Sequence, residues 1–229
     1  MDRKFVFIAI AIALVAVIAL AAMSGGGEKE KEQGEPENPS VPDAKHTSSI
    51  TLDRYRAYLT TSDSPALSAE VSPSDSSDGV TWSSSDESVA TVDSAGKVSI
   101  KKWGPVVISA ESGGHKAECL LVINSPEHSG ALEPSNATAA GIEGKRILRA
   151  FALPESAVES ALGFYGYSDS VAKEAASGCT GNWQMYADLA AKRIYAEGGL
   201  DRDGVAQKMV SQGWPEDLAK EAVTLLKDA

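Results

Sequence analysis

The sequence predicts a multidomain chain with an N-terminal transmembrane helix, an antiparallel β-sandwich and an all-α tandem repeat of two copies of about 47 residues. Three observations predict it: an uncharged apolar stretch near the start, short alternating runs in the middle, and a C-terminal region that repeats itself without a gap. The predicted segments are a membrane anchor or signal segment (1–23), a flexible linker (24–46), the sandwich (47–125), a second linker (126–135) and helical repeats at 136–181 and 182–229.

Length, charge and cysteine content narrow the class of protein. A chain of 229 residues has room for two modest domains and connecting segments. The net charge is −11 and no segment of the chain is basic, which argues against nucleic acid as a partner. Cys119 and Cys179 fall in different predicted modules, so we expect both to be small buried residues, with a bridge between them as the alternative.

The stretch from Phe5 to Met23 has no charged or polar side chain. As a helix it would extend about 28 Å, close to the thickness of a bilayer core. Cleaved signal peptides have shorter apolar cores, although Ala19-Leu20-Ala21 could serve as a cleavage site. We therefore expect residues 5–23 to hold the chain in the cell membrane by a single pass, and secretion after cleavage is the alternative. Arg3 and Lys4 predict that the N-terminus is inside and the later domains are extracellular.

The composition changes sharply after this stretch. Residues 24–46 contain three consecutive glycines, an alternating Glu/Lys run and three prolines. Such a segment cannot bury enough apolar surface to fold, and we expect a solvated tether.

Residues 50–123 alternate with a period near two, as half-buried strands do. Asp78-Gly79 and Ser112-Gly113-Gly114 supply turns between the runs. Six or seven short strands in this space predict an antiparallel sandwich of the immunoglobulin kind. The alternating apolar positions are Leu67, Val71, Val80, Trp82, Val98, Ile100, Val106, Ile108, Ala117, Cys119, Leu121 and Ile123.

The stretch VTWSSSDESVATVDSAGKVS at residues 80–99 resembles the bacterial Ig-like domain of group 2, the intimin and invasin type. The Trp, the Val-Ala-Thr-Val run and the Asp-x-x-Gly-Lys-Val hairpin carry the resemblance. It implies a surface-displayed spacer or adhesion module in which these positions are scaffold. We expect Trp82 in the core, and stacking on a ligand is the alternative.

The C-terminal region changes to a helical period. Shifting the chain by 47 positions aligns residues 140–179 with 187–226 and makes eleven of forty pairs identical. Such a period indicates stacked supersecondary units. Each copy is predicted to hold one long and two short helices, and we expect the copies to pack together because neither can enclose a core alone.

The second copy shows the helix signals clearly. One apolar face marks its long helix, Gly198-Gly199 ends that helix, Asp201 caps the next, Gly213 stops it, and Pro215 begins the last. The first copy uses Pro154, Gly166 and Ser168 in the same roles. The predicted inner positions are Ile142, Ile147, Phe151, Trp183, Tyr186, Ala187, Ala190, Ile194, Leu218, Ala222, Leu225 and Leu226, with Tyr167 and Trp214 each closing over two short helices.

This pattern is similar to the helix-turn-helix-like repeat of the Ltp-type host cell surface-exposed lipoproteins. Asn182-Trp183 and the stretch from Leu200 to Val223 carry the resemblance, which is close in the second copy and loose in the first. Members are commonly anchored through a lipidated cysteine, whereas an apolar helix is expected to anchor this chain. The resemblance implies superinfection exclusion, in which a surface protein blocks DNA entry by another phage.

No motif for catalysis, a cofactor or a metal emerges. Residues 136–229 hold ten Lys/Arg and thirteen Asp/Glu, so the helix-turn-helix pattern does not predict DNA binding. The repeated pairs Lys145-Arg146 and Lys192-Arg193 are expected as solvated charge on the outer helix face, with a local basic patch as the alternative. The Asp201–Gly204 run is better explained by capping than by a calcium loop. The histidines are isolated in the sequence, and no catalytic, cofactor-binding or metal residues are predicted.

These observations predict a non-catalytic cell-surface adhesion protein, displayed outside the membrane, with the helical repeat as its interaction head. Its expected partner is a protein or a cell-wall ligand. Phage superinfection exclusion at the envelope is the alternative, and a role as accessory to a cell-wall enzyme is a second alternative.

Overall fold

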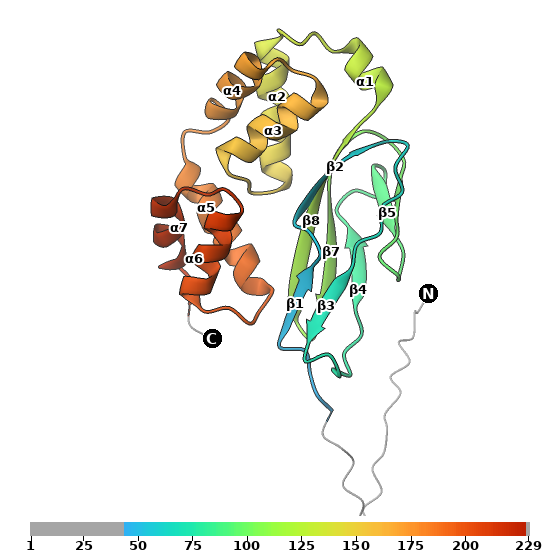
Figure 1. The fold of residues 1–229 in the computed structure, drawn as a ribbon, viewed down its shortest axis with the longest axis vertical. Helices are drawn as coiled ribbons and strands as arrows, with labels where there is room; N and C mark the ends of the chain where they lie inside the picture. The colour runs from blue at the N-terminus through green and yellow to red at the C-terminus, as the bar shows by residue number, and fades with distance from the viewer. Residues whose placement is uncertain (1–43, 228–229) are drawn as a thin grey trace, which may run out of the picture. The chain divides into compact units, whose positions relative to one another are not determined.

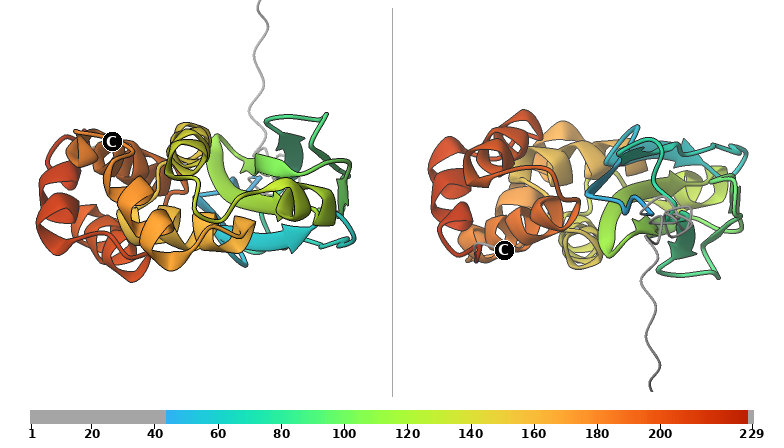
Figure 2. Two further views of the ribbon diagram at one scale, coloured as in Figure 1. Left: turned by 90° about the horizontal axis from the view of Figure 1, so that it is seen from above. Right: turned by 90° about the horizontal axis from the view of Figure 1, so that it is seen from below.

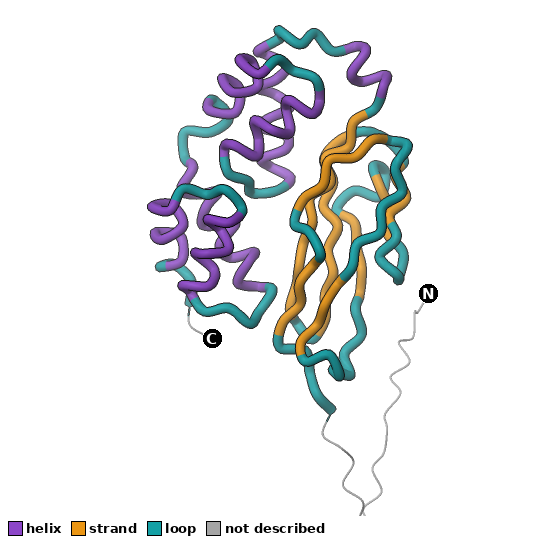
Figure 3. Tube along the Cα trace, viewed as in Figure 1, coloured by secondary structure: helices purple, strands orange, loops and turns teal. Residues whose placement is uncertain are grey.

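Eight strands are followed by seven helices in the computed structural model, which describes residues 44–227 (Figure 1, Figure 3). The expected anchor at 5–23 lies outside the described residues, as does the expected linker up to residue 43. Among the helices that are described, none combines the length and apolar character needed to cross a membrane.

The β part is a sandwich built on one long hairpin. Strands β7 (Gly104–Ser112) and β8 (His115–Asn124) pair antiparallel, and Gly113 and Gly114, both with positive φ, form the turn between them. The remaining strands are β1 (Ser49–Leu52), β2 (Arg56–Thr60), β3 (Ala69–Ser72), β4 (Thr81–Ser84), β5 (Ala90–Val92) and β6 (Val98–Ile100). They form sheets in the orders β1-β3, β2-β8-β7-β4 and β5-β6.

One pair of strands departs from the expected antiparallel sandwich. Strand β2 pairs parallel with β8, from Arg56 opposite Leu120 to Thr60 opposite Asn124. The expected antiparallel pairing is therefore wrong for this pair, and it is confirmed for β1-β3, β4-β7, β5-β6 and β7-β8. Only residues 53–55 separate β1 from β2, so the chain changes sheets without the tight reversal that a hairpin requires.

The strands of the long hairpin are buried on both faces. Val106, Ile108 and Leu121 point into the sandwich, while Leu120 and Val122 belong to the core that the helices share. The alternating sequence pattern predicted the burial of Val106, Ile108 and Leu121 and not that of Leu120 and Val122. A strand covered on both sides has a near-continuous apolar run, and Cys119 to Ile123 is such a run.

The helices are gathered on one side of this hairpin (Figure 1, Figure 2). The first copy consists of α2 (Ala137–Ala150), α3 (Glu155–Tyr165) and α4 (Asp169–Ser177), and the second of α5 (Trp183–Ala196), α6 (Arg202–Ser211) and α7 (Glu216–Val223). Each copy has the expected long, short, short order. A further helix, α1 (Pro126–Ala131), lies within the segment 126–135 that was expected as a linker.

Both copies use the same turn between their short helices. Gly166 and Gly213 adopt positive φ values of 110° and 99°. The N–H of the next residue then donates to a carbonyl five positions earlier, from Tyr167 to Leu162 and from Trp214 to Met209, each at 3.2 Å. This is the geometry of a glycine-terminated helix end, and it directs both aromatic rings inward, as the sequence predicts.

Each copy has its own cluster of buried residues, and only the cluster of the first copy includes buried residues of the sheet. The first includes Val107, Leu120 and Val122 of the sheet, whereas the buried members of the second all come from α5 to the end of the described chain. Trp183 and Tyr186 pack against both clusters. The expectation that neither copy forms a core alone holds for the first copy, whose core the sheet completes.

Two expected inner positions are exposed. Ile142 is 63% exposed and Leu225 is 58% exposed. Ile142 is five positions from Ile147, a spacing that places the two side chains on different helix faces. Helix α7 ends at Val223, so helical periodicity no longer directs Leu225 inward.

The repeated Lys-Arg pairs divide between solvent and the interior. Lys145 and Lys192 are exposed, as expected. The expectation was wrong for the arginines, which are partly buried: Arg146 lies over the Trp103 ring, and Arg193 donates to the carbonyl of Ala152 at 3.0 Å. Neighbouring residues on a helix point about 100° apart, so one member of each pair can face inward.

Candidate functional site

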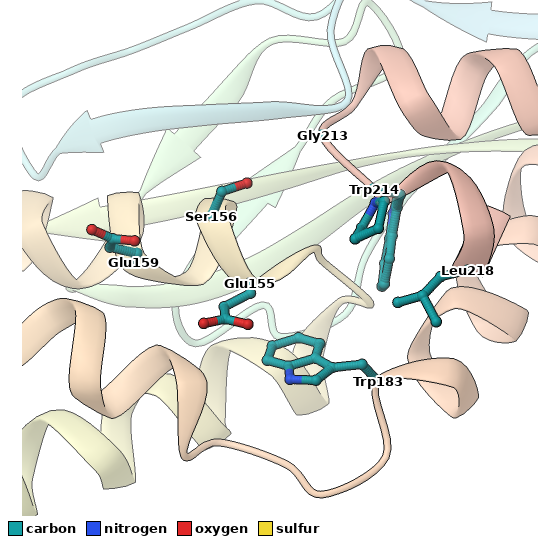
Figure 4. A pocket seen from close by; sticks show the side chains of 8 residues that line it. Glu155, Ser156, Glu159, Trp183, Gly213, Trp214 and Leu218 are labelled. Carbon is teal, nitrogen blue, oxygen red and sulfur yellow. The ribbon is translucent and has the colours of Figure 1, made fainter.

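The candidate site is a cleft of about 360 Å³ between the two helical copies (Figure 4). We call it the inter-copy cleft. Glu155, Ser156 and Glu159 of α3 line it from the first copy, and Trp183, Trp214 and Leu218 line it from the second.

Trp183 is positioned by the start of α5. The side chain of Asn182 accepts a hydrogen bond from the backbone N–H of Met185 at 3.0 Å and caps the helix, so Trp183 is its first residue. Its ring lies 6.5 Å from the Tyr186 ring and packs on both helical cores. The side chain is only partly buried, so part of an indole ring is available to a ligand in the cleft.

The turn at Gly213 brings the second copy against the first. A Cβ at Gly213 would lie 3.3 Å from Ser156 Oγ, so glycine serves both the positive φ and the close approach. Trp214 follows and is 2% exposed. Its indole Nε1 has no hydrogen-bond partner among the described residues. The nitrogen exposes almost no surface, so it lies inside the wall of the cleft.

Two carboxylates form the acidic side of the cleft. Glu155 opens α3 and Glu159 follows one turn later, so both project from the same part of one helix. Pro154 precedes them and makes no side-chain capping hydrogen bond. The first N–H groups of α3 therefore have no capping side chain, and their partial positive charge stabilises the carboxylate of Glu155 in the first turn. Within the described chain no ion pair is formed by either carboxylate.

A polar network joins the helical copies to each other and to the sheet. The Arg193 guanidinium lies 3.7 Å from the Phe151 ring centroid and donates to Gln212 Oε1 at 3.2 Å. Tyr55 of the β part donates to the backbone carbonyl of Gln212 at 3.2 Å. The backbone N–H of Ile50 donates to the carbonyl of Glu197 at 2.7 Å. These contacts fix the second copy, and with it one wall of the inter-copy cleft.

Burial changes the proton affinity of this network. It lowers the pKa of Arg193, and the nearby carboxylates of Glu118 and Glu197 oppose that shift. It also raises the pKa of Glu197, although the ammonium group of Lys208, which donates to Glu197 Oε2, acts in the opposite direction. Burial thus disfavours the charged form of both groups, and the opposite charges nearby counteract it.

The cysteines and the Asp201 run have structural roles. Cys119 and Cys179 are free and buried, as expected. Asp201 Oδ1 accepts from the backbone N–H of Gly204 at 2.8 Å, so it caps α6 as expected. In residues 44–227 no group of three His, Cys, Asp or Glu side chains is arranged to hold a metal ion.

The cleft residues were visible in the sequence but not as a site. The sequence predicts Trp183 on an apolar helix face and Trp214 as a ring that closes over two short helices, and it places Glu155 at a helix start without a separate role. What joins them is the contact between copies, which depends on the approach of Gly213 to α3. A tryptophan as the first residue of a helix, directly after its capping residue, is a signal that could have drawn attention to Trp183.

Comparison with known proteins identifies the β part. Residues 46–120 match the model of the bacterial Ig-like domain (group 2). The chain is 42% identical over 69 residues to an uncharacterized protein of Clostridium acetobutylicum, and 37% identical over 107 residues to an alpha-L-arabinofuranosidase of Bifidobacterium longum. It is also 29% identical over 114 residues to a lacto-N-biosidase of Bifidobacterium bifidum.

These matches cover 30%, 45% and 47% of this chain. The chain spans only 7%, 10% and 10% of the lengths of those curated relatives. A crystal structure of an intimin mutant from EHEC O157:H7 is also similar, at 20% identity and a TM-score of 0.26, over 52% of this chain and 66% of that one. The β part of this chain is therefore similar to the bacterial Ig-like domains of group 2 over residues 46–120.

Proposed function

We propose that this protein is a non-catalytic binding protein of the cell surface, in which the Ig-like domain supports the two helical copies and the copies act as the interaction head. The inter-copy cleft carries the proposal, because it combines the partly exposed indole of Trp183 with two carboxylates. Such a mixture of aromatic surface and a few polar groups is typical of ligand sites. The apolar stretch at residues 5–23 supports a membrane anchor with the head outside.

The arrangement of the cleft favours binding over catalysis. Glycoside hydrolysis requires two carboxyl groups that flank the bond to be cleaved. Glu155 and Glu159 instead project from one part of a single helix. No histidine lines the cleft beside the Ser156 hydroxyl, so a serine–histidine pair is absent from the described lining.

Binding to intact bacterial cells and isolated cell walls tests the proposal. We expect labelled protein to bind one of these preparations, and Trp183→Ala to weaken that binding about tenfold, the effect of losing about 1.4 kcal/mol of contact. Leu189→Ala is the matched control, because Leu189 lies on the same helix, is 48% exposed and is outside the cleft. Equal binding by the wild type and Trp183→Ala, or no binding at all, would overturn the proposal.

Superinfection exclusion is the second candidate. It is supported by the resemblance to the Ltp-type repeat, whose glycine-aromatic turn occurs in both copies. It requires that expression of the protein leaves phage adsorption unchanged and reduces DNA entry, and equal DNA entry with and without the protein would count against it.

A further inference from the structure

An aromatic ring and a carboxylate already hold a cation elsewhere in this chain. The Arg146 guanidinium lies 5.1 Å from the Trp103 ring centroid, and its Nη1 lies 3.4 Å from Glu143 Oε2. The guanidinium thus interacts with the electron-rich face of the indole and with a carboxylate at the same time. This cluster, formed between the β part and the first copy, shows that a cation fits between an indole ring and a carboxylate.

The inter-copy cleft has the same two components without the cation. Trp183 supplies the indole, and Glu155 and Glu159 supply carboxylates from the other copy (Figure 4). No lysine or arginine of the described chain lines the cleft. An ammonium or guanidinium group from a partner would occupy the place that Arg146 occupies beside Trp103.

The net charge of the helical copies also favours a cationic partner. Residues 136–229 hold ten Lys/Arg against thirteen Asp/Glu, a net charge of −3. An acidic surface attracts a basic partner and increases its rate of association at low salt.

We infer that the inter-copy cleft binds a lysine or arginine side chain of an extended basic segment in a partner protein. The cation packs on the Trp183 ring and pairs with Glu155 and Glu159. This inference rests on the proposed binding function, for which it names the class of partner.

Calorimetry on the full chain in a neutral detergent tests the inference with three synthetic peptides. One alternates lysine with glycine, one replaces lysine with uncharged norleucine, and one replaces it with glutamate. We expect binding of the lysine peptide only, with an affinity that falls as salt is added. Glu155→Gln should weaken it about tenfold, the effect of losing one charge-assisted contact. Glu221→Gln, an exposed change of equal charge on α7 outside the cleft, should leave the affinity unchanged.

The outcomes separate this inference from the proposed function. Equal binding of the lysine and norleucine peptides, or equal weakening by Glu155→Gln and Glu221→Gln, would overturn the inference. Binding to cells that depends on Trp183, together with no binding of the lysine peptide, would also overturn it and would leave the proposed function in place. Tight binding of a neutral cell-wall oligosaccharide in the same cleft would assign it a different ligand and overturn the inference.

Discussion

Equivalent side chains in the two helical copies make different contacts, because different segments pack against them. Arg146 and Arg193 occupy equivalent positions in the two copies. Arg146 packs on Trp103 of the β part, and Arg193 packs on Phe151 of the other helical copy. The sequence predicts a charge at each position and the repeat predicts their equivalence. It does not predict their inward direction, because that depends on surfaces contributed by distant segments.

The cysteines give a prediction at the scale of the residue. Burial raises the pKa of the Cys119 thiol to about 12 and also raises the pKa of Cys179. Since the thiolate is the reactive form, neither should be alkylated by iodoacetamide in the native protein at pH 8. Both should react after unfolding in guanidinium chloride, as mass spectrometry would record. Labelling of native Cys179 at the rate of a free cysteine would contradict the burial described for it.

At the scale of the element, helix starts and stops are the most predictable features. Asp201, Gly166 and Gly213 act locally, through a capping oxygen or a positive φ, so the chain near them is sufficient to identify their roles. Ser168 occupies the expected N-cap position of α4, yet its side chain makes no capping hydrogen bond. A position in a motif is easier to predict than the hydrogen bond it makes.

The strands show why other features could not be predicted. Alternation identified one face of β8 correctly, including Cys119 and Leu121. It gave no reason for Leu120 and Val122 to be buried, since their cover comes from helices later in the chain. The parallel pairing of β2 is equally non-local. The inter-copy cleft belongs to the same class, because its walls come from separate helical copies.

At the scale of the whole described unit, the sheet is a shared structural layer. Leu120 packs with the helical core of the first copy, whereas its neighbour Leu121 packs inside the sandwich, and both are fully buried. The helical copies are therefore supported by the Ig-like domain through direct packing and not only through the chain connection. This support is consistent with the proposed role of the β part as a base for a binding head.

Replacing these two leucines tests the shared layer. Leu120→Ala and Leu121→Ala should each lower the free energy of unfolding by about 2–5 kcal/mol. Amide hydrogen exchange should distinguish them, because Leu120→Ala removes a contact with the first copy and should reduce protection in α3 more strongly. Equal protection of α3 in both variants would show that the helices do not depend on this face of the sheet.

The central claim is that the cleft between the helical copies is where a partner binds. The chain has four tryptophans, and two of them, Trp183 and Trp214, line that cleft. Heteronuclear NMR of indole-labelled protein, with the signals assigned by substitution, would follow all four during titration with the lysine peptide. We predict shifts in the Trp183 and Trp214 signals and none in those of Trp82 and Trp103. Shifts confined to Trp82 or Trp103, or unchanged spectra at saturating peptide, would contradict the claim.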